Sequence, residues 1–238
     1  MIFVVRVDDV GWTAEASDRH PIKKPDAGLF LAQKFHAAMQ GVPWLAAIVP
    51  AELDEQGVSW IRSAPAGMVP ALHGWNHECQ LGGEENEFWG LTREQCRARL
   101  KLGLEKLGVP IRHFVPPFNA LDQPLVDACA DLGLEVIWGR PEPEFPIPKV
   151  LGRVMFVPSS EELYGAAAMK MGVRQRALLD ELPSQLDVPG VSCLTLHLPW
   201  EAHSGPGFQG VKTLASMIKD RAVDPDGYVS NANRWRGM

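Results

Sequence analysis

The chain lacks several features that would assign it to a class at once. Its 238 residues include four cysteines but no Cys-x-x-Cys pair, which argues against a structural zinc knuckle. No apolar run is long enough to cross a bilayer, and no basic segment precedes an apolar stretch of signal-peptide length. We therefore expect a cytoplasmic protein with no transmembrane segment and with reduced, mostly buried thiols.

Positive charge is also in short supply. The 23 Lys and Arg residues are outnumbered by 29 Asp and Glu residues, which gives a formal net charge of -6. This balance supplies no basic patch, so we expect no nucleic-acid partner. Tyrosine is scarce, with two residues against eight tryptophans. Tryptophan faces stack well on sugar rings, although a buried tryptophan is the commoner case.

Short apolar runs alternate along the chain with helical patterns. The runs predict strands at 2–7, 44–49, 68–72, 113–116, 134–138, 154–157 and 193–198. Helical spacing and capping residues predict helices at 27–40, 92–107, 122–132, 173–182 and 210–220. Apolar strands that are each followed by a helix indicate a mostly parallel sheet in an α/β protein. About seven such units favour a barrel, although periodicity does not separate a barrel from an open sheet.

Two adjacent carboxylates, Asp8 and Asp9, directly follow the first strand. Buried carboxylates are costly unless they are paired or bound to metal. Active sites of parallel α/β proteins also gather at the carboxyl ends of strands. The alternative is that one of the two simply caps the next turn.

The third strand ends in His73, and His77 follows four residues later. Imidazole suits zinc and similar metals. Two unrelated surface histidines are the alternative interpretation. An Asp from the first strand and these two histidines would make a three-ligand set with an open position, as catalytic zinc sites have.

Two later strands also end in residues suited to a site. Pro116 and Pro117 follow the fourth strand and precede Phe118 and Asn119, and the last strand ends in His197. Alone, the first segment would be a stiff loop and His197 a satisfied core histidine. The ordered set of four strand ends is harder to explain in that way.

In this order the motifs resemble those of the polysaccharide deacetylase family with the NodB homology domain, carbohydrate esterase family 4. Asp8-Asp9 resembles its Asp-Asp motif, and His73 to His77 its His-x-x-x-His motif. Phe114 to Asn119 is similar to its Arg-Pro-Pro-Phe/Tyr motif, and Leu194 to His197 to its Leu-x-Leu-His motif. The residues in and around these motifs are most similar to those of an atypical branch of the family, which includes deacetylase-like proteins of O-antigen biosynthesis.

The resemblance implies a fold and a metal. The fold would be a distorted (β/α) barrel with about seven parallel strands, formed by residues 1–238 as a single catalytic domain. Asp9, His73 and His77 would hold a divalent metal, with Zn2+ the first choice and Co2+ or Ni2+ the alternatives. The metal can bring the pKa of the attacking water to about 7.

The resemblance also implies roles for the remaining motif residues. Asp8 would be the general base that deprotonates the water. The backbone N–H of Phe118 would help to hold the oxyanion, and His197 would protonate the leaving amine. Further residues near the strand ends are expected to contact substrate: Trp75, Pro117, Asn119, Arg140 and Trp200.

Two departures from the family pattern stand out. Val115 occupies the position of an Arg that usually orients the base, and the usual Asp that tunes the acid His has no evident match. Arg140 is a candidate substitute for the missing Arg, and Arg6 and Arg153 stay open. An acidic run formed by Glu78 and residues 84–87 is expected to be a solvated face rather than a ligand group.

The predicted function is hydrolytic removal of an N-acyl group, first of all acetyl, from an amino sugar. The expected cytoplasmic location favours a small-molecule or lipid-linked precursor of a surface polysaccharide or O-antigen. One alternative is a non-catalytic carbohydrate- or metal-binding homologue, which the missing Arg supports. Another is a metal-dependent amidohydrolase acting on a different small amide.

Overall fold

The computed structural model describes residues 2–11, 27–77, 87–140, 149–158, 161–162, 191–198 and 208–235. The chain divides into two compact units. Unit 1 comprises 1–46, 66–69 and 160–238, and unit 2 comprises 47–65 and 70–159. The division passes through strands β2 (Trp44–Ile48) and β3 (Met68–Leu72).

In unit 1, β1 (Ile2–Val10) pairs in parallel with β9 (Val191–His197), in a register that runs from Ile2 opposite Val191 to Asp8 opposite His197. The short β8 (Glu161–Glu162) pairs in parallel with β9. Every side chain of β1 from Phe3 to Val10 is buried. Burial on both faces is typical of a parallel strand covered on each side. This packing fixes the position of the residues at the end of β1.

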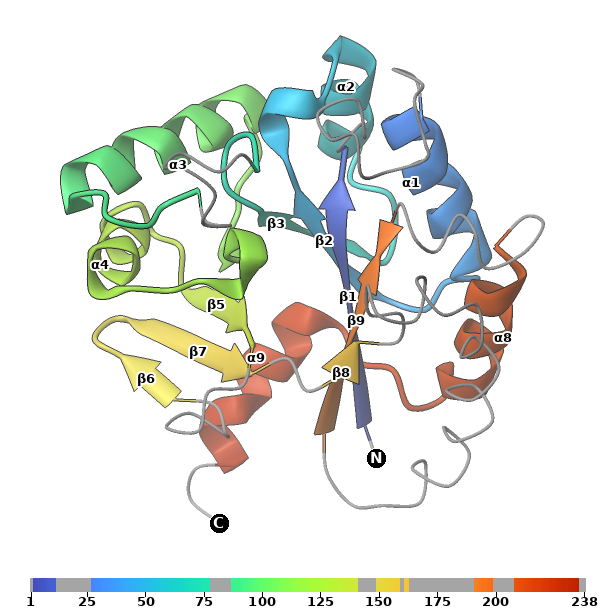
Figure 1. Cartoon of the computed structure of the whole chain (residues 1–238). Coiled ribbons are helices and arrows are strands. Elements are labelled where there is room, and N and C mark those ends of the chain that lie inside the picture. The colour runs from blue at the N-terminus through green and yellow to red at the C-terminus, as the bar shows by residue number, and fades with distance from the viewer. Residues whose placement is uncertain are drawn as a thin grey trace, which may run out of the picture. The chain divides into compact units, whose positions relative to one another are not determined.

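Within its described residues, unit 1 contains the helices α1 (Ala27–Ala38), α8 (Gln209–Ile218) and α9 (Pro225–Trp235). Figure 1 shows α1 beside α8. Phe35 of α1 lies between aromatic neighbours, with ring centroids 5.1 Å from Trp44 and 6.0 Å from Phe208. The sequence pattern predicted α1 and α8, whereas it left α9 without an assignment.

In unit 2, β4 (His113–Phe114) pairs in parallel with β3 on one side and β5 (Val136–Gly139) on the other. Next to β5 lies the parallel β7 (Val154–Pro158), and β6 (Lys149–Leu151) pairs with β7 in the antiparallel direction. The carboxyl ends of β3 and β4 therefore lie at one edge, which brings the residues after them together.

The described part of unit 2 contains the helices α2 (Glu55–Arg62), α3 (Arg93–Leu107) and α4 (Gln123–Asp131), and the 3-10 turns η2 (Pro50–Glu52) and η3 (Pro117–Asn119). Figure 1 shows α3 and α4 packed together. The capping box of Thr92 and Gln95 begins α3, and Gly108 ends it in the left-handed conformation. These caps were predicted from the sequence.

The described strands form a sheet in the order β6-β7-β5-β4-β3-β2-β1-β9-β8. The α/β class is confirmed, and every predicted strand is present within a few residues of its expected bounds. The short β6 and β8 and the helix α2 were not predicted, and the predicted helix at 173–182 lies outside the described residues. No helix in the described part of the chain is long and apolar enough to cross a membrane.

The thiols of Cys96, Cys129 and Cys193 are buried and form no disulfide within the described ranges. Burial raises the pKa of the Cys96 thiol to about 11 and that of Cys129 well above its ordinary value. Both thiols therefore stay protonated at neutral pH, and they pack as small apolar groups. Cys79 lies outside the described residues.

Candidate metal centre and active site

The end of β1 carries a buried ion pair. Arg6 and Asp8 are two residues apart on one strand, so their side chains leave the same face. Arg6 donates from Nε to Asp8 Oδ1 at 2.7 Å and from Nη2 to Asp8 Oδ2 at 2.5 Å. Arg6 is 0% exposed and Asp8 is 2% exposed. The two parallel bonds compensate the burial of both charges and fix the orientation of the carboxylate.

His197 lies on the neighbouring strand opposite Asp8. Its Nε2 is 3.9 Å from Asp8 Oδ2, and its side chain is 22% exposed. This separation is too long for a direct hydrogen bond but short enough for an ion pair with a protonated imidazole. Unit 1 thus brings together the predicted base and the predicted acid.

His73 is held by a carbonyl at the end of the next strand. Its Nδ1 lies 2.8 Å from the backbone oxygen of Val115. A carbonyl only accepts, so Nδ1 carries the proton in this bond, and Nε2 is the candidate metal-ligand atom. Bonds of this kind orient metal-binding imidazoles in many proteins. Val115 is fully buried, and this carbonyl is its contribution to the site.

His77 closes the loop that begins at His73. The ring centroids of the two histidines are 4.8 Å apart, and the His77 ring lies 4.3 Å from that of Phe118 on its other side. The motifs after β3 and β4 therefore contact each other directly. Unit 2 assembles both predicted histidine ligands against the Pro-Pro-Phe turn.

A carboxylate that the sequence analysis did not select supports this loop. Glu87 is 0% exposed, and its Oε1 and Oε2 accept the backbone N–H groups of Trp75 at 2.7 Å and His77 at 2.9 Å. Burial raises the pKa of Glu87, while the two amide bonds act in the opposite direction. The expected solvated acidic face is therefore wrong for Glu87, because its partners are amides brought near by folding. Residues 78 and 84–86 lie outside the described ranges.

Backbone strain concentrates at these residues. Positive φ angles outside glycine occur at Asp9 (62°), His77 (55°), Phe118 (57°) and Asn119 (57°), among a few other described positions. The left-handed region is unfavourable for such side chains, and strain of this kind tends to persist at functional sites. No sequence signal indicated it, since none of these positions is a glycine.

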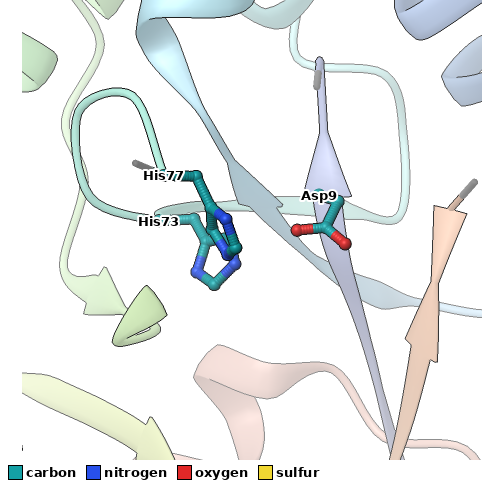
Figure 2. Close-up of side chains that lie close together, drawn as sticks. All are labelled: Asp9, His73 and His77. Atoms are coloured by element: carbon teal, nitrogen blue, oxygen red, sulfur yellow. The ribbon is translucent and has the colours of Figure 1, made fainter. Parts of the chain in front are cut away.

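One candidate metal group emerges from the described residues. The ligand atoms of Asp9, His73 and His77 all lie within 4.8 Å of one another, and Figure 2 shows the three side chains. One carboxylate and two imidazoles form the donor set of many catalytic zinc sites, which leave further positions for water and substrate. The residues therefore fit a divalent metal of the zinc type.

The predicted substrate contacts have mixed surroundings. Trp75 and Asn119 are half-buried, and Pro117 is buried in the turn after β4. Arg140 is exposed directly after β5, and Trp200 lies outside the described residues. Of the arginines considered for the role vacated at Val115, Arg6 donates two hydrogen bonds to Asp8 within its own strand.

Comparison with known proteins points to one fold. No protein-family model and no curated protein matches the chain. A structure named as a polysaccharide deacetylase from Mycobacterium smegmatis shares 17% identity over 99% of this chain and 91% of its own, with a TM-score of 0.69. A family 4 carbohydrate esterase from Streptomyces lividans, solved with acetate, shares 13% identity over 94% and 91%, with a TM-score of 0.59.

The chain has the polysaccharide deacetylase fold. This confirms the predicted distorted (β/α) barrel class. The same fold also occurs in a family 4 pseudoenzyme from Bacillus anthracis, at 10% identity over 95% of this chain and 64% of that chain, with a TM-score of 0.60. A deacetylase fold therefore does not decide activity by itself, and the site residues must carry the functional argument.

Proposed function

We propose that the protein is a metal-dependent hydrolase that removes an N-acyl group, acetyl in the first instance, from an amino sugar. The observation that carries the proposal is the donor set of Asp9, His73 and His77 on a polysaccharide deacetylase fold. The paired Asp8 and His197 in unit 1 supply the groups that proton transfer needs.

A divalent metal held by the three ligands would polarise the acyl carbonyl and make the attacking water more acidic. Zn2+ suits the donor set best, with Co2+ and Ni2+ as alternatives. His73 contributes Nε2, because its Nδ1–H is committed to the carbonyl of Val115. The same bond keeps the ring from turning away.

Asp8 accepts the proton of the attacking water. Its two bonds with Arg6 hold the carboxylate in one orientation. In this proposal Arg6 does the work that the resemblance assigned to an Arg at the position of Val115. The guanidinium reaches the base from its own strand rather than from the turn after β4.

His197 then delivers a proton to the leaving nitrogen. Water adds to the acyl carbon, the C–N bond breaks, and the amine departs with the proton while the acyl group leaves as a carboxylate. The backbone N–H of Phe118 stabilises the developing oxyanion. Trp75, Asn119, Arg140 and Trp200 are proposed as contacts for the sugar and its carrier.

The proposed substrate is a nucleotide-linked or lipid-linked N-acetyl amino sugar on the route to a cell-surface polysaccharide or O-antigen. A cytoplasmic location, predicted from the sequence, is part of this proposal. Such a substrate offers an apolar sugar face and an anionic carrier. The tryptophans match the former and Arg140 the latter.

The test is acetate release by the Zn2+-loaded protein from UDP-linked and lipid-linked N-acetyl sugars. We expect release from at least one of them, and a loss of release when Zn2+ is removed by a chelator. Absence of acetate from every substrate, with Zn2+ bound at one equivalent, would contradict the proposal.

A non-catalytic carbohydrate- or metal-binding role is the second candidate, and the likeness to a pseudoenzyme favours it. Asp8→Asn separates the two roles. A catalytic protein loses turnover and keeps its metal, whereas a binding protein shows no turnover before or after the change. An amidohydrolase acting on another small amide would instead release acid from non-sugar N-acetyl and N-formyl compounds.

A further inference from the structure

We propose that Glu87 is a positioning residue that sets the separation and orientation of the two metal-ligating imidazoles by holding the backbone between them. The inference rests on the proposed metal site and extends it to a residue outside the four motifs. Glu87 lies ten residues after His77, and its carboxylate contacts the loop rather than solvent.

The contacts of Glu87 span the loop. Oε1 accepts from the amide of Trp75, and Oε2 accepts from the amide of His77. One rigid carboxylate thus fixes two alternate peptide units between the ligands. The N–H that donates to Oε2 belongs to His77, which is itself a proposed ligand. Any shift of Glu87 therefore displaces the backbone from which the His77 ring projects.

The loop leaves room for this carboxylate only because residue 74 is a glycine. A Cβ at Gly74 would lie 2.2 Å from Glu87 Oε2 and 2.6 Å from Pro117 Cγ. Gly74 also has a φ of +71°, which side chains rarely adopt. The close approach of the carboxylate and the shape of the loop therefore depend on each other.

Glu87 is itself anchored on the core of unit 2. Arg99 of α3 donates from Nη1 to the Glu87 backbone oxygen at 3.2 Å. The next residue, Phe88, is buried and meets Phe114 of β4 edge to face, with centroids 6.1 Å apart. The backbone at Glu87 is thus fixed on the core of unit 2, and the carboxylate in turn fixes the loop.

The chemistry of the side chain explains why a carboxylate stands here. Each of its two oxygens accepts one backbone N–H, which a carboxylate does symmetrically. A glutamine has one acceptor oxygen, and its NH2 group would face the second amide as donor to donor. Glu87→Gln therefore keeps the volume but breaks one of the two bonds.

The test is Co2+ binding, followed by the visible d–d absorption that reports the coordination geometry. We expect Glu87→Gln to bind Co2+ about 10–100-fold more weakly than the parent protein and to show an altered spectrum. The matched control is Glu94→Gln, which removes an exposed carboxylate from the first turn of α3. It should bind Co2+ like the parent protein.

The outcomes separate this inference from the proposed function. Equal Co2+ affinity and an unchanged spectrum in a folded Glu87→Gln protein would overturn the positioning role alone. No Co2+ binding by the parent protein would overturn the metal site and the positioning role together. If Glu87→Gln does not fold, Gly74→Ala against Gly133→Ala makes the same comparison, because only the former places a Cβ against the carboxylate.

Discussion

Asp8 and Glu87 are both buried carboxylates of the candidate site, but they are compensated in different ways. Asp8 meets a guanidinium two residues earlier on the same strand. Glu87 meets two neutral backbone amides from a loop ten to twelve residues earlier. The guanidinium beside Asp8 orients that carboxylate through two charge-assisted bonds, whereas the amides around Glu87 fix the shape of the backbone.

The difference suits Asp8 to a role in proton transfer and Glu87 to a role in positioning the metal ligands. A change at Asp8 should act on turnover, and a change at Glu87 or its contacts should act on metal binding. The following substitutions test that division, from the largest expected effect to the smallest.

Asp8→Asn should give the largest loss. An amide does not accept the proton of the attacking water, so kcat should fall about 10²–10⁴-fold. Zn2+ affinity should change little, because Asp8 is not among the proposed ligands. Steady-state acetate release and calorimetric Zn2+ titration measure the two quantities. Asp220→Asn, at an exposed position after α8, is the control. A parent-like kcat in Asp8→Asn would remove Asp8 from the mechanism.

Arg6→Met should lower the free energy of unfolding by about 3–5 kcal/mol, because it leaves the buried carboxylate of Asp8 without its cation. Urea unfolding of the single variants and of Arg6→Met with Asp8→Asn forms a double-mutant cycle. We expect the second change to recover a large part of the loss. Additive effects of the two changes would show that the pair is not coupled.

Gly74→Ala should be less stable than Gly133→Ala. Both positions have positive φ, which costs an added side chain about 1–2 kcal/mol. Only the Cβ at Gly74 meets neighbours, whereas the one at Gly133 has nothing within 4 Å. We expect overpacking to add about 1–3 kcal/mol at Gly74 in urea unfolding. Equal stabilities of the two variants would mean that the Glu87 side chain shifts at little cost to accommodate a Cβ at residue 74.

Thr92→Ala should have the smallest effect. It removes the cap of α3 and should lower stability by about 0.5–2 kcal/mol. The bonds of the cap join Thr92 and Gln95, so Co2+ affinity should stay at the parent value. Thermal unfolding together with Co2+ titration provides the check. A weakened Co2+ affinity would show that metal binding follows global stability and not the loop contacts.

The sequence predicted the parts of the fold that local patterns control. Apolar runs located the strands, and Thr92 with Gln95 marked the start of α3, because capping depends on neighbouring residues. The strand ends also led to Asp8, Asp9, His73, His77 and His197 as candidates. Their catalytic and metal-binding roles stay predictions until activity and metal binding are measured.

What the sequence did not predict depends on contacts made by folding. The amide partners of Glu87 come from a loop whose path no local pattern encodes. The helix α2 is short and follows a 3-10 turn, so its pattern was too brief to stand out. Arg6 was within reach of prediction, since residues two apart on a strand share a face, and that rule favours Arg6 over Arg140 as the partner of Asp8.

The central claim is that Asp9, His73 and His77 hold one catalytic metal. A crystal of the Zn2+-loaded protein, measured on both sides of the zinc absorption edge, tests it most directly. The account predicts one strong anomalous peak within about 2.0–2.2 Å of an Asp9 oxygen and of a nitrogen from each histidine. A zinc peak bound to other residues, or no peak in a crystal soaked with Zn2+, would contradict it.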